Sequence, residues 1–372
     1  MKTTIADIRA DHYLIKLPVT LSDSTHGQMT HFELVTVRIR DEGGREGSGY
    51  TFTVGTNGAA VHATVQSDLA PRLAGERSDL IEALWKKMWW ALHYGGRGGT
   101  AAMAISAVDI ALWDLKAKLL GCPLAGLLGP ARASVPIYGS GGFTSYDAGQ
   151  ARDQLAGWVE RDHIPRVKIK IGESWGGNEH RDIGRVALAR EVIGPGTELY
   201  VDANGGYTAD QAVRVAGRMA DYGVTWFEEP VSSQDLAGLA AVRRQVLPDV
   251  AAGEYSWSLA DSAHLIAAGA VDCLQLDATR CGGFTEFLRG AALAAAHNLQ
   301  VSAHCAPNLH AHAGVAVPNL RHVEYFHDHQ RIERLLFDGA LDPGGGTLTP
   351  DPDRPGLGMC LKEADADKYR RG

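Results

Sequence analysis

The order of apolar and polar positions divides the chain into regions of different pattern. Within residues 1–130, the segment Phe32–Arg40 alternates as a half-buried strand does, and Asp41–Gly44 then supply a turn. The segment Thr100–Leu119 predicts a helix, because its apolar residues recur at offsets of three and four, at Ala101, Ile105, Val108, Leu112 and Leu115. Strands that precede a helix in this way predict a compact α+β domain.

From residue 131 to about residue 340, short apolar runs alternate with helical stretches such as Asp210–Tyr222 and Phe284–His297. Eight of these runs have the length of a strand: Val135–Tyr138, Val167–Ile171, Leu199–Val201, Thr225–Phe227, Val250–Ala252, Cys273–Leu276, Gln300–Ala303 and His322–Phe326. This pattern predicts parallel βαβ units of the α/β class, closed into a (β/α)8 TIM-type barrel. An open doubly wound sheet is the alternative, although Thr144 stands where a G-x-G-x-x-G loop needs its last glycine.

The charge balance raises the question of how an anionic ligand would be held. The 372 residues include 36 Lys and Arg against 44 Asp and Glu, which gives a net charge of −8. No basic block marks a nucleic-acid or membrane surface, so we expect neither as a partner. Because a negative chain does not attract an acidic substrate, an anion site would need local cations or a bound metal.

Cysteine spacing and the length of the apolar runs indicate the compartment. Five cysteines occur and none forms a C-x-x-C pair, which argues against a disulfide framework and against a Cys-type zinc site. The first residues lack the pattern of a signal peptide, and no run of about 18 uncharged apolar residues occurs. We therefore expect a soluble, cytoplasmic protein.

Three carboxylates follow three consecutive apolar runs. Asp202, Glu228 and Glu254 are each 26 positions apart, which is the length of one βα unit. A helix cap or a surface ion pair would explain any one of them alone, but in a barrel all three meet at the strand ends where active sites lie. Such a cluster needs a counter-charge, and we expect one Mg²⁺ per active site, because Mg²⁺ prefers oxygen ligands. Glu229 points to the other side of an extended chain, so only one of this pair is expected to be a ligand.

Two lysines share one face of the preceding strand. Lys168 and Lys170 lie at positions i and i+2, while the apolar residues between and around them face the other way. A solvated strand edge is the simpler interpretation, but a parallel barrel strand has no solvated face. Two ammonium groups this close lower each other's pKa, so we expect one of them to act as a neutral base.

Later runs also end in reactive groups. Asp277 follows one run and His304 the next, so the carboxylate would hold one imidazole nitrogen and raise the basicity of the other. Glu324, in the eighth run, would in its neutral form donate a hydrogen bond to a developing oxyanion. A His-rich zinc site is an alternative, because six histidines lie within 26 residues: His304, His310, His312, His322, His327 and His329. Of these, His304 alone stands at a predicted strand end.

These groups together predict a metal flanked by two bases from different strands, Lys170 and His304. Such a site suits a substrate whose carboxylate binds the metal while a base removes the neighbouring α-proton. The metal and Lys168 would stabilise the resulting enediolate. General base catalysis itself contributes about 10²–10⁴-fold, so electrostatic stabilisation must lower the rest of the barrier.

The ordered set of motifs resembles the enolase superfamily and, within it, the mandelate racemase subgroup. The helix sequence from Ala104-Ile105 to Asp109–Asp114 is similar to that family's cap-domain motif, and Lys168-Ile169-Lys170 is similar to its K-x-K motif. The resemblance implies that Lys170 and the His304–Asp277 pair are the bases, with Lys168 and Glu324 as further catalytic groups. It also implies that the metal ligands are Asp202, Glu228 and Glu254.

The resemblance implies two domains. Residues 1–130 would form an α+β cap, residues 131–340 a modified (β/α)7β-type barrel, and the Gly- and Pro-rich residues 341–372 would return to complete the cap. Cap loops near residues 20–28 and 50–57 would select the substrate, and their polar composition favours a polyhydroxylated one. The candidate substrate-binding residues are Lys168, Asn204, Glu324, Ser24, His26 and Tyr50.

The resemblance favours a Mg²⁺-dependent dehydratase, a hydro-lyase, that acts on an acid sugar, either an aldarate or an aldonate. Elimination of the β-hydroxyl would give a 2-keto-3-deoxy sugar acid. The same residues also suit a racemase or epimerase of a 2-hydroxy acid, a sugar-lactone cycloisomerase, or a non-catalytic sugar-acid binding protein. Family members are usually homo-oligomers, and Trp85, Trp89 and Trp90 would serve either as interface anchors or in the core.

Overall fold

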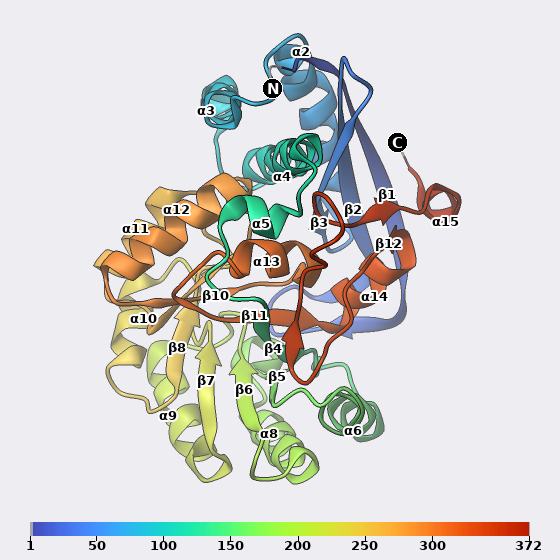
Figure 1. Ribbon diagram of the computed structural model, residues 1–372. Coiled ribbons are helices and arrows are strands. Elements are labelled where there is room, and N and C mark those ends of the chain that lie inside the picture. The colour runs from blue at the N-terminus through green and yellow to red at the C-terminus, as the bar shows by residue number, and fades with distance from the viewer. Residues whose placement is uncertain (1–2, 372) are drawn as a thin grey trace.

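The computed structural model describes residues 3–371, and its N-terminal part is a three-stranded antiparallel sheet (Figure 1). Its strands β1 (Ile5–Ser22), β2 (Gln28–Asp41) and β3 (Glu46–Thr53) lie in the order β1-β2-β3. The predicted strand and turn are present, since the turn after Asp41 leads directly into β3. Six consecutive residues of β2, from Phe32 to Val37, are buried. The half-buried pattern expected from the sequence is therefore too simple, because this part of the sheet is covered on both faces.

Helices follow this sheet along the chain. They are α1 (Gly58–Ala63), η1 (Thr64–Leu69), α2 (Ala70–Leu73), α3 (Ile81–Ala91), η2 (His93–Gly95), α4 (Thr100–Leu120) and α5 (Leu124–Leu128). Of these, α1, η1, α2 and α4 contact the strands of the sheet. Helix α4 begins after Gly99 and ends at Gly121, whose φ of 66° is the left-handed conformation typical of a helix end. Almost all of α4 is buried rather than one face alone, because it packs against β2 and β3 on one side and against a barrel helix on the other.

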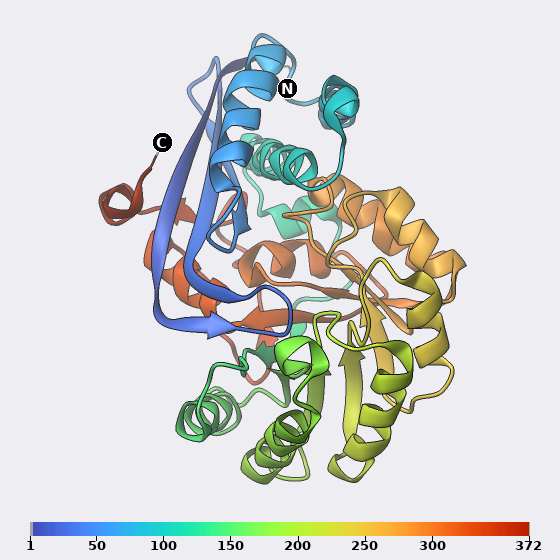
Figure 2. The same cartoon turned by 180° about the vertical axis from the view of Figure 1, so that it is seen from behind.

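Eight parallel strands form a closed barrel below the sheet (Figures 1 and 2). They are β4 (Val135–Ser140), β5 (Arg166–Lys170), β6 (Glu198–Asp202), β7 (Val224–Glu228), β8 (Asp249–Ala252), β9 (Cys273–Leu276), β10 (Gln300–Ala303) and β11 (Leu320–Phe326). Each pairs with the next, and β11 pairs with β4 to close the barrel. The sequence prediction of a TIM-type barrel with a separate α+β cap is confirmed, and every predicted strand overlaps an observed one.

Helices surround the barrel strands. They are α6 (Ala148–Ala156), η3 (Gly157–Arg161), α7 (Glu173–Gly176), α8 (Glu179–Ile193), α9 (Ala209–Met219), η4 (Ala220–Tyr222), α10 (Leu236–Arg243), α11 (Leu259–Ala267), α12 (Gly283–Ala296), α13 (Pro307–Gly314) and α14 (His327–Leu336). The last elements are β12 (Phe337–Asp338), β13 (Thr347–Leu348), β14 (Cys360–Leu361), α15 (Glu363–Ala366) and η5 (Asp367–Tyr369). Strand β13 adds to β4, whereas the chain after it runs back to β1, where Arg371 N donates to the His12 carbonyl.

The barrel interior is filled by a layer of large side chains beneath the strand ends. Tyr138, Tyr200 and Trp226 pack there with Ala251 and Cys273. The indole N–H of Trp226 donates to a carboxylate oxygen of Glu228 at 2.9 Å, so this layer also supports the polar groups above it. The barrel therefore has a packed core, as is usual for this architecture, and its strand ends are the place for chemistry.

Buried hydrogen bonds join the cap to the barrel. The carboxylate of Asp109, on α4, accepts hydrogen bonds from Thr285 N and Oγ1 of α12 at 3.0 and 2.6 Å. Burial raises the pKa of Asp109 to about 7. Asp114, one helical turn further along, accepts from Ser48 N and from Leu357 N, both at 2.7 Å. The cap sheet, the long helix and the C-terminal segment are thus connected through a single buried carboxylate.

The tryptophans considered as interface anchors have different environments. Trp85 is buried and donates to the Gly282 carbonyl at 2.8 Å, so it belongs to the contact between cap and barrel. Trp90 is 52% exposed and lies beside the Arg97 guanidinium. Homo-oligomerisation stays a prediction. Across residues 3–371, none of the helices combines the length and apolarity that a membrane crossing requires.

The close packing of β3 on α4 predicts the effect of adding one methyl group. In Gly49→Ala, the new Cβ would clash with the Ala107 carbonyl oxygen and would lie 2.6 Å from the Ala111 nitrogen, both in the helix backbone. We expect the free energy of unfolding to fall by about 1–3 kcal/mol, because an added methyl group in a rigid core typically costs this much.

The matched control is Gly184→Ala in α8, where the new Cβ meets nothing within 4 Å. This variant should be more stable by about 0.5–1 kcal/mol, because alanine is the better helix former. Urea denaturation of both variants measures the two shifts. Unfolding of Gly49→Ala at the parent midpoint would contradict the packing described here.

Candidate active site

The three predicted carboxylates lie together at the C-terminal ends of neighbouring strands. Asp202 ends β6, Glu228 ends β7, and Glu254 follows β8 by two residues. Asp202 and Glu228 are direct partners in the register of the two strands, so the sheet itself places their side chains side by side. All three are buried, and one oxygen from each lies within 4.8 Å of the others. The 26-residue spacing therefore brings the three carboxylates together at the strand ends, as expected from the sequence.

The two lysines of β5 face these carboxylates. Lys170 Nζ contacts Asp202, while Lys168 Nζ lies 2.5 Å from Glu228 Oε1 and 2.8 Å from Glu324 Oε1. Burial alone would lower the pKa of Lys170, but the contact with Asp202 raises it above the ordinary value for lysine. The carboxylates therefore outweigh the like charge of Lys168 in this arrangement and raise the pKa of Lys170 instead of lowering it. The role of one lysine as a base stays a prediction.

The predicted His304–Asp277 pair is formed. His304 Nδ1 lies 2.8 Å from Asp277 Oδ2, which leaves Nε2 facing the carboxylates, 3.3 Å from Glu254 Oε2. Burial would raise the pKa of Asp277, but the hydrogen bond from His304 outweighs it, and the pKa lies below the ordinary value. Asp277 also accepts from Thr279 N and Oγ1 at 2.7 and 2.6 Å, so the side chain that orients His304 is itself held in place.

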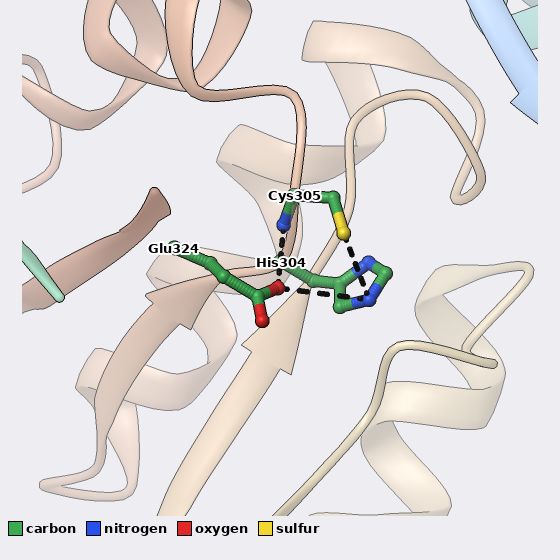
Figure 3. A group of neighbouring side chains, drawn as sticks. All are labelled: His304, Cys305 and Glu324. Carbon is green, nitrogen blue, oxygen red and sulfur yellow. Dashed lines mark hydrogen bonds and ion pairs between the residues drawn. The ribbon is translucent and has the colours of Figure 1, made fainter. Parts of the chain in front are cut away.

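Glu324 and Cys305 complete this side of the site (Figure 3). Glu324 Oε2 accepts from Cys305 N at 2.8 Å and lies 3.7 Å from His304 Nε2, while Cys305 Sγ lies 3.3 Å from the same nitrogen. Burial would raise the pKa of Glu324, but Lys168 outweighs it and holds the pKa well below its ordinary value. In this arrangement the ammonium group in contact with Glu324 therefore favours the carboxylate form, and the role of Glu324 as a neutral hydrogen-bond donor stays a prediction.

Sequence reasoning missed one cation of the site. The Arg280 side chain is 13% exposed, with Nη1 3.2 Å from Glu254 Oε1 and Nε 3.6 Å from Asp277 Oδ2. Its guanidinium also lies 5.1 Å from the centre of the Phe52 ring, which belongs to the cap. The position three residues after Asp277, in the loop that follows β9, was the available signal, because loops at this end of a barrel carry functional side chains.

The other histidines of the His-rich stretch are separated from one another. His310 accepts from Ala278 N at 2.9 Å, and His322 lies inside the barrel against Ser302. His329 accepts from Ala306 N at 3.1 Å and is surrounded by aromatic rings. Among residues 3–371, the groups that could hold a metal are Asp202 with Glu228 and Glu254, and His304 with Cys305 and Glu324. A zinc site built from several histidines is therefore not formed there.

A cavity lies between the cap and the barrel beside these groups. Lys170, Asn204, Glu254 and His304 line it from the barrel side, and His26 lines it from the cap. Figure 2 shows how the hairpin turn between β1 and β2 reaches down to the barrel. His26, in this turn, lies 2.8 Å from Asp23 and 2.5 Å from the Tyr255 hydroxyl. Of the predicted substrate-binding residues, Asn204 and His26 therefore reach the cavity directly.

The other four predicted substrate-binding residues do not line this cavity. Lys168 and Glu324 are buried and lie 2.8 Å apart. Tyr50 is buried in strand β3 and donates its hydroxyl hydrogen to Glu333. Ser24 donates to the Ala203 carbonyl at 2.5 Å, so its hydroxyl holds the hairpin turn against the barrel. The sequence treated residues 50–57 as a loop, but Tyr50–Thr53 are strand, and Phe52 and Val54 are the residues of this segment that reach the cavity.

Glu229 differs from its neighbour Glu228. Its backbone has a φ of 36°, and it lines a second, more open hollow beside Ser232 and Ser256 rather than the cavity between cap and barrel. Glu229 is not part of the group formed by Asp202, Glu228 and Glu254. This placement agrees with the expectation that one residue of the pair faces the other carboxylates.

The three strand-end carboxylates suit a hard divalent cation. Their oxygens are close, buried and of the type that Mg²⁺ prefers, and Glu254 Oε2 is buried without a hydrogen-bond partner. Burial and the neighbouring Asp202 raise the pKa of Glu228 well above its ordinary value. A cation placed among them would relieve this repulsion and satisfy the unpartnered oxygen.

Comparison with known proteins identifies the family. Residues 4–129 match the family described as "Mandelate racemase / muconate lactonizing enzyme, N-terminal domain", and residues 150–365 match "Enolase C-terminal domain-like". The chain is 39% identical to 3,6-anhydro-alpha-L-galactonate cycloisomerase of Streptomyces coelicolor, over 96% of this chain and 97% of that protein.

Solved structures agree with this relationship. A mandelate racemase/muconate lactonizing enzyme-like protein from Rubrobacter xylanophilus is 47% identical, with a TM-score of 0.93 over 99% of this chain and 100% of that one. The L-talarate/galactarate dehydratase from Salmonella typhimurium LT2, liganded with Mg and L-lyxarohydroxamate, is 30% identical, with a TM-score of 0.92 over 100% of this chain and 94% of that one. The chain therefore belongs to the enolase superfamily, in its mandelate racemase/muconate lactonizing enzyme subgroup, and is an enzyme of that superfamily.

Proposed function

We propose that the protein is a Mg²⁺-dependent dehydratase of an acid sugar. The observation that carries this proposal is the placement of two bases on either side of one carboxylate cluster. Lys170 contacts Asp202 at one end of the cluster, and His304 lies 3.3 Å from Glu254 at the other. Both groups line the same cavity, so a substrate bound there meets one of them on each side. Lys170 would accept a proton once the cation engages Asp202, because that carboxylate is what holds the proton on the lysine.

Asp202, Glu228 and Glu254 would hold the Mg²⁺. When bound, this ion supplies a Lewis acid that fixes the substrate carboxylate and stabilises negative charge on it. The L-talarate/galactarate dehydratase from Salmonella typhimurium LT2, whose structure is liganded with Mg and L-lyxarohydroxamate, supports this proposal. Lys168, which already contacts Glu228 and Glu324, would add a second positive charge at the same carboxylate.

The bases would carry the protons of the reaction. One of them removes the proton from C2, which leaves an enediolate. His304, protonated and oriented by Asp277, then donates a proton to the hydroxyl group on C3 while the C3–O bond breaks, and water leaves. The enol that remains loses the hydrogen of its C2 hydroxyl and takes up a proton at C3 to become the 2-keto-3-deoxy acid, so protons are conserved and no oxidant is needed.

Cycloisomerisation is a second candidate, favoured by the relative named as a 3,6-anhydro-alpha-L-galactonate cycloisomerase. If the oxygen on C3 belongs to an ether ring, the same elimination opens the ring. The oxygen then stays in the product as an alcohol, and the product is an isomer of the substrate. Both reactions use the same C2 proton and the same C3–O bond, so the residue roles proposed above apply to either.

Incubation of the Mg²⁺-loaded enzyme with a panel of acid sugars in D₂O distinguishes the reactions. A keto product 18 mass units lighter than its substrate, before deuterium is counted, supports dehydration. A keto product of unchanged formula identifies cycloisomerisation, and deuterium at C2 with inversion identifies a racemase or epimerase. A complete lack of product and of deuterium uptake across the panel would contradict any catalytic function and favour a sugar-acid binding protein.

The metal assignment predicts the effect of one isosteric change. Glu254→Gln removes a negative ligand while keeping the shape of the side chain. Loss of even an outer hydrogen-bonding partner of a metal site costs about 10–100-fold in affinity, so we expect Mg²⁺ affinity to fall at least as much. Isothermal titration calorimetry with Mg²⁺ measures this directly. Glu229→Gln is the matched control and should keep the parent affinity, whereas equal loss in both variants would refute the assignment.

The proposed role of His304 predicts that one substitution affects the dehydration rate but not the exchange of the C2 proton. His304→Asn should lower the dehydration rate by about 10²–10⁴-fold, the usual contribution of a general acid. It should retain exchange of the C2 proton with D₂O for the stereoisomer whose proton faces Lys170. His297→Asn, an exposed histidine after α12, is the control and should dehydrate at the parent rate. Parent-like dehydration by His304→Asn would show that another group donates the proton.

A further inference from the structure

The cap side of the catalytic cavity is apolar. Six of the eight cap residues that line it are hydrocarbon or thioether side chains: Leu17, Leu21, Met29, Phe32, Phe52 and Val54. They come from all three strands of the cap sheet and from the residue after β3. On the barrel side, Phe143 and Phe326 continue the same surface. These eight residues are called the apolar wall below. A polyhydroxylated substrate was expected because the cap loops are polar in sequence. The cap residues that line the cavity are instead mostly apolar.

Aromatic rings make the apolar wall rigid. Phe32 and Phe52 stack with their ring centres 5.3 Å apart, and both meet the edge of His329, at 4.9 and 4.1 Å. Phe326 packs on the same imidazole at 5.4 Å and on Phe143 at 5.7 Å. Because these rings pack against one another, the side chains of the apolar wall are held in place. Water or backbone groups therefore do not reach a ligand hydroxyl buried against the wall.

The polar cap residues at the cavity are already paired. Asp23 accepts from the backbone of Thr25 and His26 and lies 2.8 Å from the His26 imidazole. The other imidazole nitrogen lies 2.5 Å from the Tyr255 hydroxyl. Neither cap residue therefore offers a free group to a substrate hydroxyl without breaking a bond that closes the hairpin turn on the barrel.

The unpartnered polar atoms lie mostly at the other end of the cavity. Among the described lining residues, buried polar atoms without a hydrogen-bond partner are Asn204 Oδ1, Glu254 Oε2 and Arg280 Nε, all at the carboxylate cluster, and Asp328 Oδ2 in α14. The cavity can thus accept several hydrogen bonds from the carboxylate end of a ligand. Beyond that end, Asp328 offers a single acceptor.

From this polarity we propose that the enzyme selects an aldonate whose end remote from the carboxylate lacks free hydroxyl and carboxylate groups, as in a 6-deoxy acid or a cyclic 3,6-anhydro acid. The inference rests on the proposed function, because it takes this cavity as the substrate site. The carboxylate, C2 and C3 occupy the polar end, and the remote carbons contact the apolar wall. Aldarates are excluded, because Arg280, the cation beside Phe52, is already paired with Glu254 and Asp277. A second carboxylate at the apolar wall would therefore be desolvated without a partner.

Matched ligands test this selection. The Mg²⁺-loaded enzyme is given L-galactonate, 6-deoxy-L-galactonate, 3,6-anhydro-L-galactonate and galactarate, and the same four types in every other available configuration. We expect the deoxy or anhydro acid to exceed its hydroxylated counterpart by about 10–100-fold in kcat/KM, because an apolar pocket rejects an added hydroxyl by at most about 10²-fold. Dissociation constants from calorimetry should follow the same order, with galactarate weakest.

A pair of valine variants locates the selection in the apolar wall. Val54→Thr exchanges a methyl group for a hydroxyl at a wall residue that is 38% exposed, so the fold should tolerate it. It should reduce the preference for the deoxy acid by about two- to tenfold, the value of one hydrogen bond. Val19→Thr, on β1, is 37% exposed and does not line the cavity, so its preference should equal that of the parent.

The outcomes separate this inference from the proposed function. Turnover that is equal or faster with the hydroxylated acids overturns the inference and leaves the dehydratase proposal intact. If no acid is turned over but the deoxy or anhydro acids bind more tightly, the inference stands and the dehydratase proposal fails. Equal changes of preference in Val54→Thr and Val19→Thr would also overturn the assignment to the apolar wall.

Discussion

The burial of like charges is the constraint on which this structure depends. Asp202, Glu228 and Glu254 are held within 4.8 Å of one another at strand ends, where the barrel register leaves them no freedom to separate. The neighbouring lysines partly compensate them, since Lys168 and Lys170 each contact a carboxylate. A protein keeps so many charges in a dry site only where ligands or ions complete the balance.

The same constraint explains how a chain of net charge −8 can bind an acid. The global charge counts surface residues that salt screens, whereas the site presents Lys168, Lys170 and Arg280 within a few ångströms of the carboxylates. The cap, in contrast, contributes apolar side chains to the cavity. Its strands supply a hydrocarbon surface above the charged layer, so one cavity has a polar end for chemistry and an apolar end for selection.

The sequence predicted the parts of the site that follow from strand periodicity. Each of the eight apolar runs overlaps a barrel strand, and the groups directly after them, from Asp202 to His304, meet at one end. Local pattern suffices there, because the barrel brings equivalent positions of successive strands together. Neither the position of Arg280 in the site nor the left-handed backbone at Glu229 follows from strand periodicity, so only the structure identified them.

The cap was predicted less well, because its role depends on contacts between distant segments. Strand β1 was not identified, although it supplies Leu17 and Leu21 to the cavity. Tyr50 was chosen for its polarity, but Phe52, two positions further along the same face of β3, is the residue that reaches the cavity. Tyr50 instead donates to Glu333, 283 positions away. The pKa direction of Lys170 was also missed, since it is set by Asp202 on the next strand and not by its own neighbour Lys168.

The most direct test of the account is the position of the divalent cation. Mn²⁺ shares the preference of Mg²⁺ for carboxylate oxygen and can be located in crystals by its anomalous scattering. We predict one anomalous-difference peak, from a Mn²⁺ ion bound by Asp202, Glu228 and Glu254, with Lys170 Nζ moved away from Asp202. A peak at His304, Cys305 and Glu324 instead, or no peak at the three strand-end carboxylates, would contradict it.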